Sequence, residues 1–325
     1  MSYPAEPKNG IIDSDGLFLV QDPELRSKIL PLFSFDPQQP DNRPRGEGTT
    51  FRIDPWSRCV TAYHVLEDLF QADRTGTQAI LRPDIRLAAL ELHGLAIGTP
   101  PIAADAWRPL SGCHALVAVE TLPLGTPRLR NLTELVLLEI HSSKFNASRT
   151  PYLPLDLQRW WPRSGERVLA LGYAGLDKTE SRDDRPISQY MYGSFGKITD
   201  IERADGSRGR PWPIFRVAAD WPGGMSGGPV FNEAGHVVGI VSAGIAGGVG
   251  TATFFAGWDL PAQMMCSIDP INPGSFFCVG AFDAGGQLVC IGQNVTEIQR
   301  LAADHQIVDS AIISFNPCNG NYTRA

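Results

Sequence analysis

A single stretch, Trp221–Val230, constrains this chain more than any other part of its sequence. Four glycines and two prolines surround Ser226 there, and the stretch leads directly into an apolar run. Glycines at this density indicate a tight backbone turn that side chains would obstruct. Such a turn exposes the serine hydroxyl and leaves neighbouring backbone N–H groups free to point at one spot. Acyl transfer needs this combination, a nucleophile beside donors that hold a developing oxyanion.

The segment Gly224–Pro229 resembles the GxSGGP nucleophile loop of the trypsin/chymotrypsin-like serine peptidases. That chemistry requires an upstream histidine base. Among the six histidines, His64 lies in Val60–Val65, which resembles the TAxH segment of the same superfamily. Upstream, Gly46–Ile53 resembles the glycine-containing strand of bacterial members. The resemblance is closest in texture to bacterial Deg-type protease domains and covers about Arg45–Leu260.

This resemblance implies an all-β fold of two antiparallel β-barrels of the chymotrypsin-like type, with the active site between them. From about Arg45 onward, short apolar runs are separated by Gly, Pro, Asn and Asp. This pattern of short apolar runs and turn residues independently favours a β-barrel or β-sandwich over βαβ units. We expect an N-terminal extension at 1–44, a first barrel at 45–150, a second at 151–262 and a C-terminal extension at 263–325.

The C-terminal extension carries its own local signals. Phe276–Phe282 and Gln287–Ile291 flank a glycine-rich turn, which predicts a hairpin. Asn294, with Glu297 three residues later, predicts the capped start of a helix. The extension can be read as a packed addition or as a regulatory or partner-binding module, and nothing in the sequence favours the second reading.

Composition limits the possible partners. The 325 residues are 43% hydrophobic, which is enough for one large or two moderate cores. The net charge of −7 argues against a nucleic-acid partner bound through its phosphates.

No apolar run approaches the roughly 20 residues of a membrane span. The sequence begins without the apolar core of a signal peptide, so we expect a cytoplasmic protein whose six cysteines are reduced. No paired ligand motif is present, so neither a metal nor another cofactor is expected.

The sequence offers two candidates for the acid, the third member of the triad. Thr133–Ile140 offers Glu134 just before an apolar strand, where the family has an aspartate. Gly165–Tyr173, which resembles the first strand of the second barrel, supports that register. Asp84 is the rival, although only 20 positions separate it from His64. A further alternative makes Glu134 a surface residue at the end of a strand.

The resemblance assigns a role to each site residue. Ser226 would be the nucleophile, His64 the general base and Glu134 the acid that orients the imidazole. The backbone N–H groups of Gly224 and Ser226 would form the oxyanion hole. Met225 stands where zymogen-activated members have an aspartate that pairs with a new N-terminus. Methionine cannot form that ion pair, so activation by N-terminal cleavage is not expected.

Substrate choice can also be predicted from the resemblance. The residue six positions before the nucleophile, Asp220, would lie at the base of the side-chain pocket, with Ser242 and Gly244 in its wall. A carboxylate there favours cleavage after arginine or lysine. If the loop instead follows the Deg-type course, Asp220 is a solvated turn residue and small apolar side chains are preferred.

The function predicted from the sequence is that of a serine endopeptidase acting on protein or peptide substrates. Two alternatives stay open at this point. One is a catalytically impaired relative that serves as a peptide-binding or scaffolding module, for which the non-standard acid is the only indication. The other is a serine esterase, because the same groups support ester hydrolysis. The sequence gives no oligomeric state.

Overall fold

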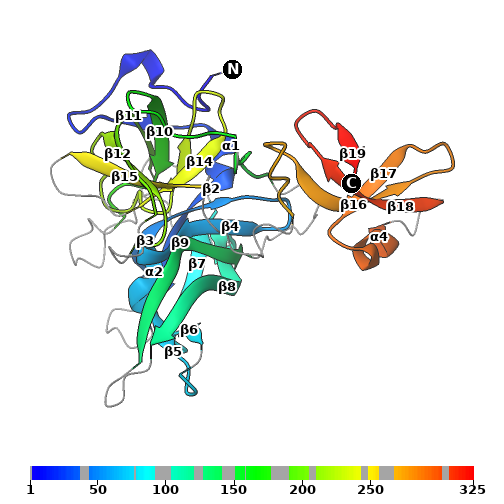
Figure 1. Ribbon diagram of the computed structural model, residues 1–325, viewed down its shortest axis with the longest axis horizontal. Helices are drawn as coiled ribbons and strands as arrows, with labels where there is room; N and C mark the ends of the chain where they lie inside the picture. Colours follow the sequence, from blue (N-terminus) through cyan, green and yellow to red (C-terminus); the bar gives the residue numbers. More distant parts are fainter. Residues whose placement is uncertain are drawn as a thin grey trace.

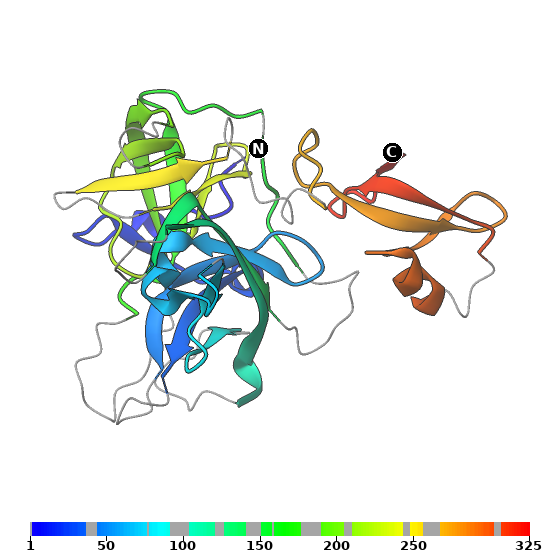
Figure 2. The ribbon, with the colours of Figure 1, turned by 60° about the horizontal axis from the view of Figure 1, so that its bottom comes forward.

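Two β-barrels lie against each other in the computed structural model, and a smaller sheet stands to one side of them (Figures 1 and 2). The structure describes residues 2–36, 44–76, 78–91, 104–120, 127–140, 151–157, 159–176, 190–204, 210–242, 248–255, 267–301 and 307–325. All pairings between named strands are antiparallel, so the prediction of two antiparallel barrels plus a C-terminal hairpin and helix is confirmed.

The first barrel closes in the order β2-β3-β4-β9-β8-β7. Its strands are β2 (Ile29–Phe35), β3 (Arg45–Arg52), β4 (Arg58–Ala62), β7 (Arg86–Leu90), β8 (Trp107–Glu120) and β9 (Arg128–Ile140). β-Branched and aliphatic residues fill its interior, as their preference for a pleated, half-buried surface predicts. A small hairpin, β5 (Phe70–Ala72) with β6 (Ala79–Leu81), lies beside it. The first barrel carries both His64 and Glu134.

The second barrel closes because β11 pairs with both β10 and β12. Its strands are β10 (Arg167–Gly172), β11 (Met191–Glu202), β12 (Ile214–Ala218), β13 (Pro229–Phe231), β14 (Val237–Val241) and β15 (Val249–Phe254). Phe215 and Phe254 meet in its core with ring centroids 6.1 Å apart. Ser226 lies in the connection between β12 and β13, at the edge where this barrel faces the first.

The N-terminal segment contributes a strand to each barrel. β1 (Leu17–Val20) pairs with β11 of the second barrel. After helix α1 (Pro23–Lys28), whose N-cap Asp22 accepts hydrogen bonds from the helix start, β2 pairs with β3 and β7 of the first. The first barrel therefore begins before the boundary at residue 45 that we expected from the sequence. The physical reason is that β2 closes the ladder between β3 and β7, which no local pattern reveals.

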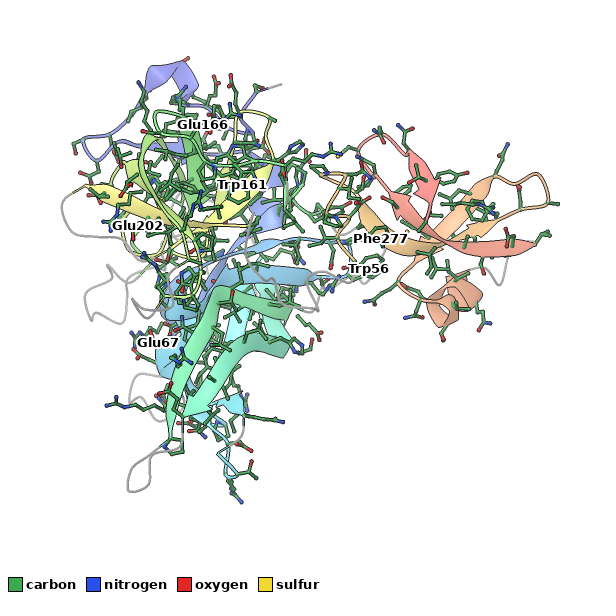
Figure 3. All side chains as sticks on the ribbon, in the orientation of Figure 1. Trp56, Glu67, Trp161, Glu166, Glu202 and Phe277 are labelled. Carbon is green, nitrogen blue, oxygen red and sulfur yellow. The ribbon has the colours of Figure 1, made fainter. Side chains whose placement is uncertain are left out.

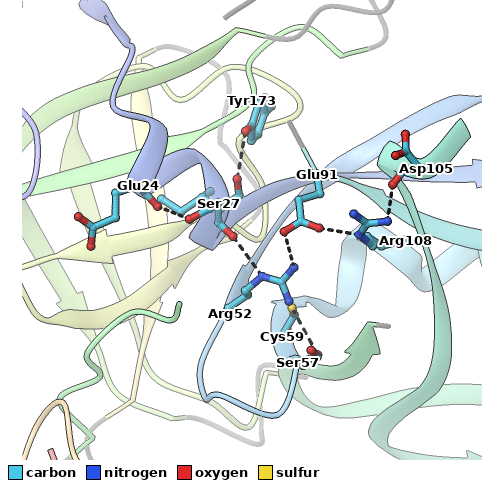
Figure 4. A network of polar contacts seen from close by, with 10 residues as sticks. Glu24, Ser27, Arg52, Ser57, Cys59, Glu91, Asp105, Arg108 and Tyr173 are labelled. Carbon is cyan, nitrogen blue, oxygen red and sulfur yellow. Dashed lines mark hydrogen bonds and ion pairs between the residues drawn. The ribbon is translucent and has the colours of Figure 1, made fainter. Parts of the chain in front are cut away.

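A buried ion-pair network holds α1 against the first barrel (Figure 4). The carboxylate of Glu91 lies 3.3 Å from Nη2 of Arg52 and 2.5 Å from Nε of Arg108. Arg52 also donates from Nε to the carbonyl of Ser27, in the last turn of α1, at 3.1 Å. Both guanidinium groups are almost fully buried, so Glu91 is the carboxylate that compensates two desolvated charges.

The C-terminal residues form a four-stranded sheet in the order β17-β16-β18-β19. Its elements are β16 (Phe276–Phe282), β17 (Leu288–Gly292), α4 (Val295–Leu301), β18 (Asp309–Phe315) and β19 (Tyr322–Arg324). Asp283 turns the first hairpin by accepting from the N–H groups of Gly285 and Gln287. At the start of α4, Asn294 accepts from the N–H of Glu297 while Glu297 accepts from the N–H of Gln293. The hairpin and the helix therefore form where the sequence predicts them.

Aromatic side chains join this sheet to the first barrel. The Trp56 ring meets Phe276 edge to face at 5.0 Å, and the Tyr152 ring does so at 5.6 Å. Figure 3 shows Trp56 on the side of the barrels that faces the C-terminal sheet. The remaining short elements are α2 (Tyr63–Leu66), η1 (Lys8–Gly10), η2 (Glu67–Leu69) and η3 (Ala104–Ala106).

Candidate active site

Strand β4 and helix α2 together position His64. The strand runs in extended conformation to Ala62, which caps the helix, and His64 is the second helical residue. The preceding Tyr63 is buried, and its ring stacks on Phe70 at 5.4 Å. Because Val65 is buried as well, the helix cannot rotate about its axis without exposing apolar surface. The imidazole is therefore held at the barrel rim, where its side chain is 25% exposed.

Glu134 reaches His64 from the neighbouring strand β9. Ala62 and Leu135 are register partners, so Glu134 lies beside the start of α2. Its Oε1 atom contacts Nδ1 of His64, and its side chain is only 4% exposed. A carboxylate at Nδ1 favours the tautomer with the proton on that nitrogen, which leaves Nε2 as the acceptor. Nε2 is buried and has no hydrogen-bond partner among the described residues.

Asp84, the other candidate acid, forms an ion pair with Arg82. It lies between β6 and β7, and its carboxylate pairs with Nη2 of Arg82 at 2.8 Å. The hydrogen bond from Arg82 lowers the pKa of Asp84 below its ordinary value. Of the two candidate acids, the structure thus brings Glu134 to His64 and leaves Asp84 with Arg82.

The nucleophile loop takes a course that few residues other than glycine permit. Gly224 has φ = 94°, in the region that side chains rarely adopt, and a Cβ there would collide with the carbonyl of Tyr173. The N–H of Gly228 donates to the carbonyl of Met225 at 2.9 Å, which closes a tight turn around Ser226. The density of glycines in the sequence therefore has a steric cause.

The two proposed oxyanion donors are free and oriented. Among the described residues, neither the N–H of Gly224 nor that of Ser226 donates a hydrogen bond. In a trans peptide the N–H points opposite to the C=O of the preceding residue. The carbonyl of Gly223 accepts from the N–H of Gly175 at 2.8 Å, and the carbonyl of Met225 accepts from the N–H of Gly228 at 2.9 Å. Both free N–H groups therefore have fixed directions, as a preorganised oxyanion site requires.

The nucleophile loop lies directly against the strands that carry the histidine. A Cβ on Gly48 would lie 2.8 Å from the carbonyl oxygen of Ser226 and 3.0 Å from Cγ2 of Val65, the neighbour of His64. The N–H of Thr49 donates to the same Ser226 carbonyl at 2.8 Å. No hydrogen bond joins the Ser226 hydroxyl to His64 within the described part of the chain. Catalytic hydrogen bonds often form only when substrate is bound.

The residues predicted to line the side-chain pocket occupy different environments. Asp220 is exposed and has no ionic partner among the described residues. The next residue, Trp221, is buried in the second barrel, and a Cβ on Gly250 would lie 2.6 Å from its ring. Ser242 directs its hydroxyl to Oε1 of Glu134 at 3.2 Å. Gly244 lies outside the described residues.

Met225 is fully buried among the apolar residues of the second barrel. Its side chain stabilises the loop by packing instead of by an ion pair. Over the described ranges, no group of three or more His, Cys, Asp or Glu is placed to hold a metal ion. No helix in the same ranges is long and apolar enough to cross a membrane.

Two contacts of the site were not predicted from the sequence. One is the hydrogen bond from Ser242 to Glu134, and the other is the set of bonds that Thr49 makes to the nucleophile loop. In the sequence, Thr49 is one hydroxyl residue inside strand β3, and Ser242 directly follows the apolar strand β14. Their targets depend on how the two barrels meet, which is a long-range property of the fold.

A family model described as the trypsin-like peptidase domain matches residues 48–240, more than half of the chain. A crystal structure of Deg5 is similar over 71% of this chain and 85% of that chain, with 15% identity and a TM-score of 0.43. No curated protein sequence matches. The match to the family model covers the segments that carry His64, Glu134 and Ser226, and the chain belongs to the trypsin-like peptidase domain family.

Proposed function

We propose that this protein is a serine endopeptidase that hydrolyses peptide bonds through an acyl-enzyme, with Ser226 as nucleophile, His64 as base and Glu134 as orienting acid. The observation that carries the proposal is the contact of Glu134 with Nδ1 of His64, which leaves Nε2 free to accept a proton. The two fixed and unused N–H groups of Gly224 and Ser226 add independent support.

Acylation follows from these positions. Oγ of Ser226 attacks the carbonyl carbon of the substrate, and its proton passes to Nε2 of His64. The negative charge that develops on the carbonyl oxygen is stabilised by the N–H groups of Gly224 and Ser226. Glu134 stabilises the imidazolium through Nδ1. The intermediate then collapses, the C–N bond breaks, and His64 donates its proton to the departing amine.

Deacylation reverses these roles with water. His64 removes a proton from a water molecule, whose oxygen attacks the ester formed on Ser226. The second tetrahedral intermediate uses the same two N–H groups. When it collapses, the C–O bond to Ser226 breaks, the proton returns to Oγ, and the carboxylic product leaves. No metal or redox step enters this scheme.

For the substrate side chain we propose a preference for arginine or lysine before the cut. The carboxylate of Asp220 is exposed, has no ionic partner among the described residues, and precedes the nucleophile by six positions. Arginine can bind a carboxylate with two parallel hydrogen bonds, which gives it geometric as well as electrostatic selectivity. The alternative is that the buried Trp221 beside Asp220 lines the pocket, in which case small apolar side chains would be preferred.

Labelling by a fluorophosphonate probe tests the proposed chemistry directly. The native protein should be labelled on Ser226 and should hydrolyse peptides, and Ser226→Ala should do neither. His64→Ala should lose hydrolysis to a similar extent, because members of a cooperating triad are not additive. Unlabelled native protein that still binds peptides would instead support the impaired binding module. Turnover of esters without peptides would support an esterase.

A further inference from the structure

Thr49 of the first barrel makes two hydrogen bonds to the nucleophile loop of the second barrel. We infer from its contacts that Thr49 is a positioning residue for the oxyanion donors, an inference that rests on the function proposed above. Its hydroxyl donates to the carbonyl of Gly224 at 2.7 Å, and its N–H donates to the carbonyl of Ser226 at 2.8 Å. The side chain thus bonds directly to the segment that carries both the nucleophile and the donors.

Every polar atom of Thr49 is in use. Besides donating to Gly224, its hydroxyl oxygen accepts from the N–H of Tyr173 at 3.0 Å. Its carbonyl accepts from the hydroxyl of Thr61 at 2.8 Å, inside the first barrel. Its partner in the β2 register is Pro31, which has no N–H and cannot compete for that carbonyl. Thr49 is completely buried, so water cannot replace any of these partners.

The bond to Gly224 fixes the peptide that lies between the two oxyanion donors. The N–H of Gly224 is oriented through the carbonyl of Gly223, and the N–H of Ser226 is oriented through the carbonyl of Met225. The Gly224–Met225 peptide connects these two units, and the Thr49 hydroxyl holds its carbonyl. If that peptide rotated, the angle between the two N–H groups would change. Both donors could then no longer reach the same oxygen.

The same residue links the base to the nucleophile. Thr49 lies on β3, and Thr61, which donates to its carbonyl, lies on β4 three residues before His64. Tyr173, on the other side, follows β10 and uses its hydroxyl to donate to the carbonyl of Ile29 at the start of β2. Thr49 therefore sets the distance between the strand that delivers the imidazole and the loop that presents the serine.

Three variants separate positioning from simple stability. Thr49→Val keeps the shape and loses the hydroxyl, so the carbonyl of Gly224 and the N–H of Tyr173 become buried without partners. Thr49→Ser keeps the hydroxyl and loses only a methyl group. Thr50→Val is the matched control: Thr50 is the next residue, equally buried, and its hydroxyl donates to the carbonyl of Val60 within the first barrel. Each of the three substitutions is introduced into the full-length chain.

We expect kcat for a peptide substrate to fall at least about tenfold in Thr49→Val with little change in KM, because oxyanion stabilisation acts in the transition state. Thr49→Ser should restore most of kcat, and Thr50→Val should leave kcat near native even though it also loses a buried hydrogen bond. The affinity for a peptide boronate, whose tetrahedral adduct places an oxygen in the oxyanion site, should fall in parallel with kcat. The affinity for a product peptide should stay unchanged.

Amide hydrogen exchange gives a readout that does not depend on activity. Exchange at Met225, Gly227 and Gly228 should be faster in Thr49→Val than in Thr50→Val, because the loop has lost its anchor. Equal kcat values and equal loop exchange in these two variants would overturn the inference while leaving the protease assignment intact. If the native protein neither hydrolyses peptides nor reacts with a fluorophosphonate, the proposed function fails. The exchange comparison then decides the role of Thr49 alone.

Discussion

The hydroxyl of Ser242 lies 3.2 Å from Oε1 of Glu134, the same oxygen that contacts Nδ1 of His64. Ser242 directly follows β14 of the second barrel, whereas Glu134 belongs to β9 of the first. The acid is therefore held from both barrels. Because Glu134 is almost fully buried, a second hydrogen bond to its carboxylate limits the rotation of the side chain.

Ser242→Ala should lower kcat by roughly threefold to tenfold, in line with the 0.5–1.5 kcal/mol of a typical hydrogen bond. Ser314→Ala is a close control, since Ser314 of β18 is as buried as Ser242 and also donates to a carboxylate, that of Asp269 in the segment before β16. Peptide hydrolysis by the two variants provides the comparison. An equal loss in both would mean that Ser242 acts only through general stability.

The identity of the acid has its own prediction. Glu134→Gln should lower turnover by orders of magnitude, because an amide can present its N–H₂ group to Nδ1 and stabilise the wrong imidazole tautomer. Asp84→Asn should have little effect, since Asp84 pairs with Arg82. Steady-state hydrolysis by both variants decides between them. If Asp84→Asn were the more damaging change, Glu134 would not be the acid.

Local motifs carried most of what could be predicted about the site. Ser226 and His64 stand out as candidates because their neighbours, a glycine-rich turn and the end of an apolar strand, are dictated by geometry within a few residues. Assigning Glu134 as the acid depends on the register between β4 and β9, which places it beside His64. The apolar run after Glu134 indicates a strand but does not give that register. Pattern reasoning succeeds where the constraint is local in sequence.

The features that were missed depend on long-range contacts. The sequence of strand β2 is a short apolar run, but its place in the first barrel depends on pairing with both β3 and β7, and β7 lies far along the chain. The targets of the Thr49 and Ser242 side chains depend on how the two barrels meet. A threonine in a strand looks the same in the sequence whether it faces a loop of another barrel or its own core. Three-dimensional packing was needed to tell these cases apart.

Loss of the Glu91 carboxylate should destabilise the first barrel, because two buried guanidinium groups depend on it. Glu91→Gln removes the charge that compensates Arg52 and Arg108, and we expect the free energy of unfolding to fall by about 3–5 kcal/mol. Glu24→Gln breaks an exposed pair with Lys28 in α1 and should change it by no more than about 0.5 kcal/mol. Denaturant unfolding of both variants measures the difference. Similar midpoints would show that the network contributes little.

Thiol reactivity should follow burial. Burial raises the pKa of Cys59 to about 12 and that of Cys278 to about 12, whereas Cys318 is exposed. The native protein should therefore react with iodoacetamide at Cys318 at pH 8, and at Cys59 and Cys278 only after unfolding, as mass spectrometry would show. Because the folded thiols hold their protons more tightly than unfolded ones, stability should fall as pH rises above about 8.5. Rapid labelling of Cys59 in the native protein would contradict this.

The side chain preferred before the cut tests whether Asp220 lies in the substrate pocket. If Asp220 binds a basic side chain, Asp220→Ala leaves that cation without its partner. Truncating one member of a desolvated charge pair costs roughly 2–5 kcal/mol, and about 1.4 kcal/mol corresponds to tenfold. Cleavage after arginine should therefore weaken at least about tenfold in Asp220→Ala, with a smaller effect after alanine or leucine.

The competing outcome has a structural basis in the neighbouring residue. Trp221 is buried, with its ring close to Gly250, so an apolar wall beside the loop would admit only small side chains. Cleavage-site profiling of a peptide library with the native protein, Asp220→Ala and Trp221→Ala measures both possibilities at once. A basic preference that disappears in Asp220→Ala supports the carboxylate. A preference for small apolar residues that is unchanged in Asp220→Ala and broadens in Trp221→Ala would exclude a role for the carboxylate. The Trp221 ring, and not the charge of Asp220, would then set the specificity.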